Sequence, residues 1–322
     1  MSERSGGTRP RVGVSSCLLG APVRYNGGHS RNRFLAEVLD RYVDWKPVCP
    51  ETEIGLGAPR ETLRLNRVGG AARAVATRSG TDHTGDLAAV ADRHLAGLRE
   101  LDGYVLKNRS PSCGLFGMPV FEDGRRVDGR GRGVFAARLT ELCPEVPVEE
   151  QGRLSDEGLR EHFVERVFAR ARLRALFTGD WRPRDLVAFH SRHKLQLMAH
   201  EPDGYRRTGR VAARAGTDGP EAVRDAYTAA FSEAMALRAT RGKHVNVLQH
   251  AFGMVGPLLD GVRRQDVLDA IDGYQEGHLP LCLPVRLLRH HSAAEGVAWV
   301  REQSYLEPYP DRLALRNTAS PA

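Results

Sequence analysis

The sequence predicts an α/β domain with a mainly parallel sheet in three layers, followed by an all-α domain. In the first half, three short segments are β-prone, at 11–16, 44–48 and 103–107. They alternate with two segments of helical spacing, at 32–42 and 86–100. Alternating strands and helices are typical of a parallel sheet covered by helices. The second half is helically periodic and nearly free of β-prone runs. We therefore expect two domains, at 10–152 and 153–310.

Two further segments of the first half contain turn signals. Residues 62–78 predict a pair of strands around Gly69-Gly70, and residues 118–133 contain Asp-Gly twice, at 123–124 and 128–129. Asp-Gly and Gly-Gly are typical of tight hairpin turns. We expect both segments to be excursions from the rim of the sheet.

The second half predicts about five helices. Their ranges are 159–177, 184–200, 220–239, 243–259 and 264–277. Pro220 suits the first turn of its helix, where a missing N–H costs nothing. The chain after Tyr309 is polar, and we expect it to be frayed.

Composition limits the class of protein. The first residues are polar, and no stretch approaches the roughly 20 apolar residues that would span a bilayer. We expect a soluble, cytoplasmic protein. Five cysteines, an odd number, argue against a disulfide framework and favour metal binding or catalysis. The formal net charge of +7 favours a polyanionic partner, although basic composition alone also explains it.

Three cysteines follow three of the predicted strands. Cys17 follows the first, Cys49 follows the second, and Cys113 lies just past the third. The carboxyl ends of parallel strands share one edge of a sheet, where loops build the ligand crevice. We therefore expect the three thiols to lie close together, although the sequence contains no Cys-x-x-Cys pair that would indicate a shared site.

Three thiolates have three explanations. They suit a structural zinc site with a fourth ligand, an iron–sulfur cluster with one iron free of protein, or unrelated buried positions. Glu51, Ser110 and Ser112 stand beside the cysteines and add more polar groups than a closed structural site needs, which favours chemistry. Cys143 and Cys282 have no such surroundings, and we interpret both as ordinary buried thiols.

A basic segment begins the helical half. Between residues 182 and 214 there are eight basic residues against three acidic ones. The basic residues are Arg182, Arg184, Arg192, Lys194, Arg206, Arg207, Arg210 and Arg214. With Phe189 and Tyr205 interleaved, this segment suits a nucleic-acid backbone, although a solvated helix face explains each arginine singly.

Three histidines lie in the same segment. His190 and His193 share a helix face and His200 follows, so a second metal site is one interpretation. Ordinary core or surface imidazoles are the other.

Several motifs match known families. Residues 12–31, 47–61 and 104–114 contain "VGVSSCLLGAPVRYNGGHSR", "PVCPETEIGLGAPRE" and "YVLKNRSPSCG", which together resemble the thiouracil desulfidase (TudS) family. From about residue 180, "LVAFHSRHKLQLMAHEPDGYRRTGRVAAR" and "KHVNVLQHAFGMV" resemble the YbgA-like helical domain. The combination resembles the tRNA 4-thiouridine desulfidases (RudS).

This resemblance implies a [4Fe-4S] cluster held by Cys17, Cys49 and Cys113, with one iron open to the sulfur of a thiolated uracil. Glu51 is then expected to activate water or shuttle a proton, and Ser110 to hydrogen-bond the substrate or the leaving sulfur. The plainer alternatives are that Glu51 only orients the Cys49 loop and that Ser110 only caps a turn.

Residues near the cysteines are candidates for substrate binding. We expect this role for Asn26, Lys107 and Ser112, and the turn at Asn26 could simply precede a helix instead. Arg24 or His29 could meet a phosphate. Lys107 and Arg109 add positive potential, unless they are ordinary surface cations.

The helical domain suggests an RNA substrate. A thiouridine stacked inside tRNA must be flipped out to reach a buried centre, at a cost of a few kcal/mol that contacts elsewhere must offset. The alternatives are a desulfidase of free thiouracil or thionucleosides, and a non-catalytic nucleic-acid-binding protein with a structural metal site.

Overall fold

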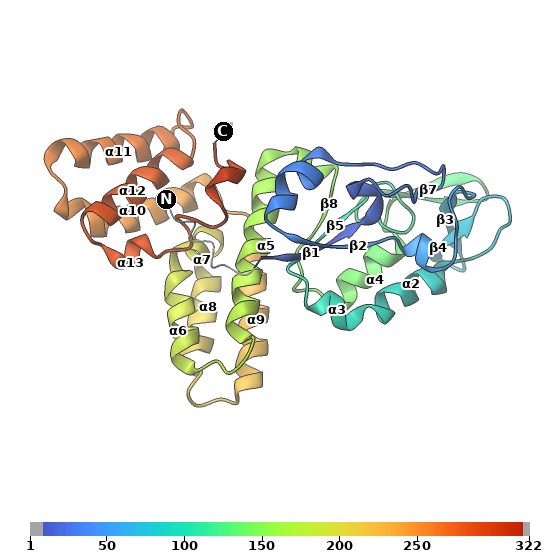
Figure 1. Cartoon of the computed structure of the whole chain (residues 1–322), viewed down its shortest axis with the longest axis horizontal. Helices are drawn as coiled ribbons and strands as arrows, with labels where there is room; N and C mark the ends of the chain where they lie inside the picture. Colours follow the sequence, from blue (N-terminus) through green and yellow to red (C-terminus); the bar gives the residue numbers. More distant parts are fainter. Residues whose placement is uncertain (1–8, 318–322) are drawn as a thin grey trace. The chain divides into compact units, whose positions relative to one another are not determined.

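A computed structural model describes residues 9–317, and the chain divides into two compact units between Phe163 and Val164. The division falls within helix α5 (Glu157–Phe177), a little after the predicted boundary near residue 152. The first unit is α/β and the second is helical, so the predicted fold class is confirmed (Figure 1).

The first unit is built on a parallel sheet. Its strands are β1 (Arg11–Ser15), β2 (Asp44–Val48), β5 (Gly103–Leu106) and β8 (Val148–Glu150). Their order is β2-β1-β5-β8, and every neighbouring pair is parallel. The three predicted strands are all present. Ser15 pairs with Val48, so β1 and β2 end side by side.

The two turn-rich segments form a second sheet instead of simple excursions. It contains β3 (Leu63–Val68), β4 (Ala71–Ala76), β6 (Met118–Glu122) and β7 (Arg125–Gly131). Each segment folds as an antiparallel hairpin, and the parallel pairing of β3 with β6 joins the hairpins. Leu65, Ala74 and Val120 give this sheet a hydrophobic core of its own.

In the described part of the first unit, four short α-helices precede α5. They are α1 (Pro50–Glu53), α2 (Thr84–Arg93), α3 (Leu95–Arg99) and α4 (Val134–Leu142). Figure 1 shows α2, α3 and α4 together on one side of β1, β2 and β5. The predicted helix at 32–42 is a π-helical turn (Phe34–Val38) followed by a 3₁₀ turn (Leu39–Arg41).

The described part of the second unit contains more helices than the five predicted. They are the C-terminal part of α5, then α6 (Pro183–Arg192), α7 (Lys194–His200), α8 (Pro202–Ala213), α9 (Pro220–Ala236), α10 (Arg241–Val255), α11 (Gly261–Gln275), α12 (Cys282–Ala294) and α13 (Ala298–Arg301). The segment 184–200 breaks at His193. Helix α8 was not predicted because Gly204 and Gly209 give this segment a low helix propensity. A Cβ on Gly204 would lie 2.5 Å from the Cβ of Ala234, so packing against α9 requires this glycine.

The prediction that the chain frays after Tyr309 is wrong for the described residues. Arg316 is only 7% exposed. Its guanidinium lies over the rings of Tyr305 and Tyr309, 5.1 and 5.8 Å from their centroids, and 3.4 Å from Glu165. These contacts anchor the end of the described chain in the second unit.

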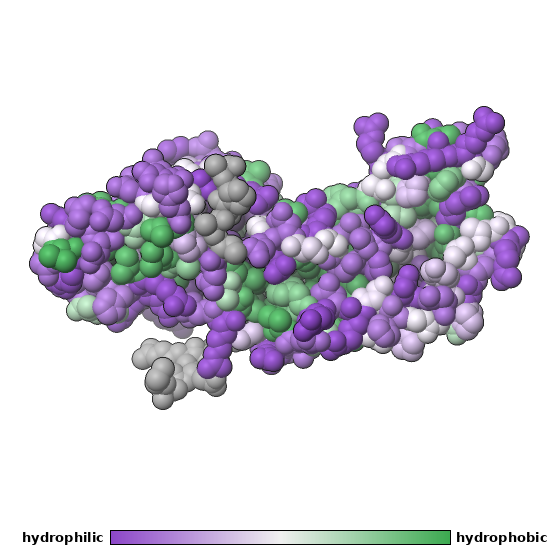
Figure 2. Space-filling model, turned by 90° about the horizontal axis from the view of Figure 1, so that it is seen from above, coloured by the Kyte–Doolittle hydropathy of each residue, from purple (hydrophilic) through white to green (hydrophobic). Residues whose placement is uncertain are grey.

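Hydrophilic residues dominate the face shown in Figure 2, in keeping with a chain that is 27% charged. None of the helices in residues 9–317 combines the length and the apolar composition that crossing a membrane requires.

Two histidines of the second unit predict a pH-dependent stability. Burial lowers the pKa of both His193 and His244 to about 3. In the unfolded chain each histidine has a pKa of about 6.5, so below this pH the unfolded chain binds a proton that the folded chain does not bind until the pH nears 3. The neutral histidines therefore contribute fully to the stability of the fold above about pH 6.5, and this contribution is lost as the pH falls toward 3.

When the pH falls from 7 to 5, we expect each of these histidines to lower the free energy of unfolding by about 2 kcal/mol. Urea denaturation of the full chain at both pH values measures the difference. His193→Phe, which keeps the stacking on Phe189, should reduce the difference by about 2 kcal/mol. Equal stability of the wild type at both pH values would contradict this expectation.

Candidate active site

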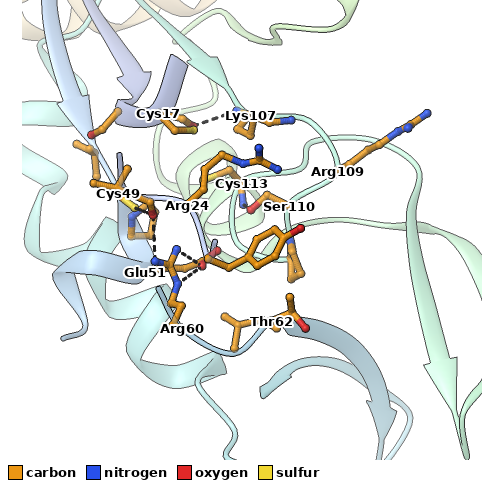
Figure 3. A pocket seen from close by; sticks show the side chains of 18 of the residues that line it. Cys17, Arg24, Cys49, Glu51, Arg60, Thr62, Lys107, Arg109, Ser110 and Cys113 are labelled. Carbon is orange, nitrogen blue, oxygen red and sulfur yellow. Dashed lines mark hydrogen bonds and ion pairs between the residues drawn. The ribbon is translucent and has the colours of Figure 1, made fainter. Parts of the chain in front are cut away.

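A cavity of about 360 Å³ lies at the carboxyl ends of β1, β2 and β5. Cys17, Cys49 and Cys113 all line it, together with Glu51 and Ser110 (Figure 3). The structure thus brings together three cysteines that are far apart in the sequence. Parallel strands place their ends at one edge, and this is the convergence that the sequence predicts.

Cys17 and Cys49 each follow directly after a strand. Cys17 lies in a 3₁₀ turn (Ser16–Leu19) directly after β1, and Cys49 separates β2 from α1. Burial raises the pKa of the Cys17 thiol, and neighbouring Cys49 raises it further, whereas Lys107 and Arg24 lower it. The two cations therefore favour the thiolate form that a metal would bind.

Cys113 lies in a tight loop that backbone contacts fix. Gly114 donates its N–H to Ser110 O at 2.7 Å, and α4 begins against the same loop. A Cβ on Gly133 would lie 2.6 Å from the Ser112 backbone, so only glycine permits this approach. Burial raises the pKa of the Cys113 thiol, and Glu51 raises it further.

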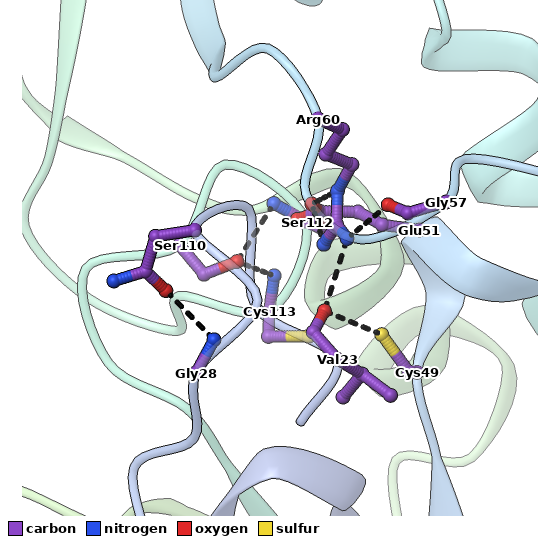
Figure 4. Close-up of polar contacts among 10 residues, drawn as sticks. Val23, Gly28, Cys49, Glu51, Gly57, Arg60, Ser110, Ser112 and Cys113 are labelled. Carbon is purple, nitrogen blue, oxygen red and sulfur yellow. Dashed lines mark hydrogen bonds and ion pairs between the residues drawn. The ribbon is translucent and has the colours of Figure 1, made fainter. Parts of the chain in front are cut away.

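Glu51 is held from two sides (Figure 4). Arg60 donates to its Oε2 from Nε at 2.8 Å and from Nη2 at 2.5 Å. The Ser112 hydroxyl donates a short hydrogen bond to Oε1. The side chains of Arg60 and Glu51 are 8% and 14% exposed, so this ion pair is largely shielded from water. It fixes the carboxylate in the cavity wall.

Ser110 is arranged to act as a donor. Its Oγ accepts the N–H of Ser112 at 3.3 Å and that of Cys113 at 3.2 Å. A hydroxyl has two acceptor positions and one proton. Because two backbone groups occupy the acceptor positions, the proton of Ser110 is left to be donated to whatever binds in the cavity.

The candidate substrate-binding residues are placed differently from one another. Lys107 lines the cavity, and its Nζ donates to Asn108 O at 2.8 Å. Ser112 is fully buried behind the wall, bonded to Glu51. Asn26 is exposed and accepts the N–H of Gly28, so it shapes a turn beside the cavity instead of lining it.

Positive charge surrounds the cavity. Arg24 and Arg109 line it along with Lys107, and Figure 3 shows Arg109 pointing away from the other labelled side chains. The guanidinium of Arg24 lies 5.6 Å from the ring of Tyr25, which also lines the cavity and is 44% exposed. An exposed ring beside cations suits a base and a phosphate at the mouth.

Sequence reasoning missed two charged residues of the site. Arg60 stands in the "GAPRE" segment that carries the family resemblance, but nothing in its spacing marks it as the partner of Glu51. Glu150, at the end of β8, is 6% exposed. Its Oε1 accepts the N–H of Leu115 at 2.6 Å and that of Phe116 at 3.1 Å, which secures the loop after Cys113.

The two remaining cysteines do not line the cavity. Cys143 is 1% exposed and packs in the core beneath the first sheet. Cys282 begins α12 in the second unit. Cys143 is therefore an ordinary buried thiol, as predicted, whereas Cys282 is only partly buried, so the prediction of a buried thiol is wrong for Cys282.

The basic segment covers α6, α7 and α8 of the second unit. Arg206 pairs with Asp203 at 2.5 Å, and Arg207 lies 3.9 Å from Glu233. Lys194 lies 5.7 Å from the centroid of the Tyr205 ring. Arg182, Arg184, Arg192 and Arg210 are all exposed. The ion pairs of Arg206 and Arg207 are exposed, and exposed ion pairs are weak.

The three histidines of this segment each have a separate partner. His190 Nδ1 lies 3.0 Å from Tyr227 Oη, His193 Nδ1 lies 2.8 Å from Phe189 O, and His200 Nδ1 lies 2.6 Å from Leu237 O. Over residues 9–317, no three His, Cys, Asp or Glu side chains converge closely enough to coordinate a single metal ion. His193 and His200 belong to the helical core, and His190 is half-buried at its edge.

Comparison with known proteins assigns the first half. The sequence model described as 2-thiouracil desulfurase matches residues 12–151. YbbK of Bacillus subtilis (strain 168), an uncharacterized protein, is 36% identical over 129 residues, which are 37% of this chain and 83% of YbbK. The chain belongs to the 2-thiouracil desulfurase family. A solved structure of TudS, a [4Fe-4S]-dependent thiouracil desulfidase, has 30% sequence identity and a TM-score of 0.38, covering 47% of this chain and 97% of TudS.

The second half of this desulfurase matches a different family. A model described as a protein of unknown function, DUF1722, matches residues 194–310. YbgA of Escherichia coli (strain K12), also uncharacterized, is 31% identical over 156 residues, which are 48% of this chain and 91% of YbgA. A desulfurase domain is thus joined to a YbgA-like domain, as the sequence motifs predict.

Proposed function

We propose that this chain is an iron–sulfur-dependent desulfidase that converts 4-thiouridine in tRNA to uridine. The observation that carries the proposal is the cavity lined jointly by Cys17, Cys49, Cys113, Glu51 and Ser110. Family membership supports desulfurisation, and the basic helical domain supports an RNA substrate. The reaction replaces a thiocarbonyl by a carbonyl, consumes water and releases hydrogen sulfide, with no net oxidation or reduction.

The donor set fits a [4Fe-4S] cluster. Three thiols stand around a cavity instead of closing on a single ion, and iron–sulfur clusters are held by cysteine thiolates. Cys17, Cys49 and Cys113 would hold three of the irons. When bound, the cluster supplies a soft Lewis acid that draws electron density from the thiocarbonyl carbon.

The residues of this chain supply the proton transfers and the orientation. Glu51, fixed by Arg60 and Ser112, accepts the proton of the attacking water through Oε1. Ser110 donates its free hydroxyl proton to the substrate or to the departing sulfur. Lys107 and Arg24 offset the negative charge that develops as the sulfur leaves.

The test of this function uses anaerobically reconstituted protein. It is incubated with thiolated tRNA, with free 4-thiouridine and with 4-thiouracil, and uridine or uracil is quantified after digestion. Faster conversion of tRNA supports the proposal. Conversion of the free compounds alone favours the alternative of a small-molecule desulfidase, and a colourless protein that contains zinc would favour a structural metal site.

RNA binding predicts a dependence on salt. We expect the double variant Arg206→Ala/Arg210→Ala to bind tRNA more weakly. The fall of log K with log salt should also become less steep, by about one unit of slope for each phosphate that the variant no longer binds. Filter binding between 50 and 200 mM salt, about the range in which such contacts dominate, measures both changes. Arg224→Ala on α9, outside the basic segment, is the control. An unchanged slope in the double variant would exclude these arginines as phosphate ligands.

A further inference from the structure

Arg60 makes more contacts in the cavity wall than its interaction with Glu51. Its Nη1 donates to Val23 O at 3.0 Å and to Gly57 O at 2.9 Å (Figure 4). Its backbone N–H donates to Tyr25 O at 2.7 Å. Val23 and Tyr25 belong to the loop that follows Cys17. Through Glu51, the same guanidinium contacts the helix that follows Cys49.

The third cysteine loop joins this network through Ser112. The Ser112 hydroxyl bonds to Glu51 Oε1, and Ser112 precedes Cys113. The Val23 carbonyl, which Arg60 binds, also lies 4.0 Å from the Cys49 sulfur. One buried arginine and one carboxylate therefore connect the loops of all three cysteines.

The hydrogen bonds also distinguish the two oxygens of Glu51. A carboxylate oxygen has about two acceptor positions. Nε and Nη2 of Arg60 occupy both positions of Oε2, whereas Oε1 accepts a single hydrogen bond from Ser112. Oε1 therefore keeps one open position. The planar fork of the guanidinium sets this difference, which the point charge of a lysine cannot reproduce.

We propose that Arg60 is a positioning residue that leaves Oε1 of Glu51 as the one open proton acceptor and ties that carboxylate to the Cys17 loop. This inference rests on the proposed function for its catalytic part. Its structural part, the restraint of the loop after Cys17, concerns the polypeptide alone.

The test compares Arg60→Ala and Arg60→Lys with Arg64→Ala. Arg64 is a matched control, because it is a half-buried arginine of the neighbouring strand that contacts Asn66 and lies over Phe121 instead of the cavity. We expect Arg60→Ala to lower kcat about 100-fold with KM little changed, since a displaced catalytic group costs about this much. Arg60→Lys should lose about tenfold, and added guanidinium ion should restore part of the kcat of Arg60→Ala.

Hydrogen–deuterium exchange gives a readout that does not depend on turnover. Loss of the bond to Val23 O should make amides of the 18–28 loop exchange roughly tenfold faster in Arg60→Ala. Wild-type kcat together with wild-type exchange in both Arg60 variants would overturn the proposal. If the wild type itself desulfurises none of the substrates, the proposed function fails, and the exchange comparison still decides the structural part.

Discussion

Replacement of Cys113 by alanine is expected to abolish desulfurisation. Cys113 is one of three thiols around the cavity, and a two-cysteine site retains too few ligands to hold the proposed cluster. We expect iron and acid-labile sulfide to fall to background after anaerobic reconstitution, and conversion of thiolated tRNA to fall below detection. Metal analysis and nucleoside quantification on the same preparation measure both.

The matched control for Cys113→Ala is Cys143→Ala. Cys143 is equally buried and packs in the same hydrophobic core, but it does not line the cavity. We expect this variant to keep its iron, its sulfide and its turnover. Full iron content in Cys113→Ala would contradict the ligand assignment.

Replacement of Glu51 by glutamine is expected to separate catalysis from cluster binding. The amide keeps the shape of the side chain but cannot accept a proton, and it removes the charge that pairs with Arg60. General acid–base groups contribute roughly 10²- to 10⁴-fold to rate, so we expect kcat to fall by about this factor. Iron and sulfide content should remain near the wild-type level.

The control for this variant is Glu53→Gln, two residues along the same helix. Glu53 bonds to His94 at 2.6 Å and does not line the cavity, so its loss should leave kcat unchanged. If Glu51→Gln turned over at the wild-type rate, Glu51 would only orient the Cys49 loop.

The sequence predicts the convergence of the cysteines because it depends on a general property of parallel sheets. Cys17 and Cys49 directly follow strands that end side by side, so assigning the strands is sufficient to place both thiols. The same reasoning cannot find Arg60. Its contact with Glu51 depends on how an irregular segment returns to the cavity, and no periodicity describes such a segment.

Long-range packing explains the other differences. The pairing of β3 with β6 joins two hairpins that local turn signals can only predict separately. Helix α8 has low intrinsic helix propensity, and it forms against α9 because Gly204 allows the two helices to approach closely. In both cases a distant partner decides the structure, and the local sequence does not identify that partner.

The position of Glu150 limits how the desulfurase domain can be isolated. This carboxylate lies on the last strand of the first sheet, yet it binds the backbone that follows Cys113. A truncated protein that stops before β8 would still carry every cysteine of the cavity, but it would lack the acceptor that shapes the third loop. The shortest fragment suitable for expression on its own therefore extends beyond the last cysteine of the cavity to include that final strand.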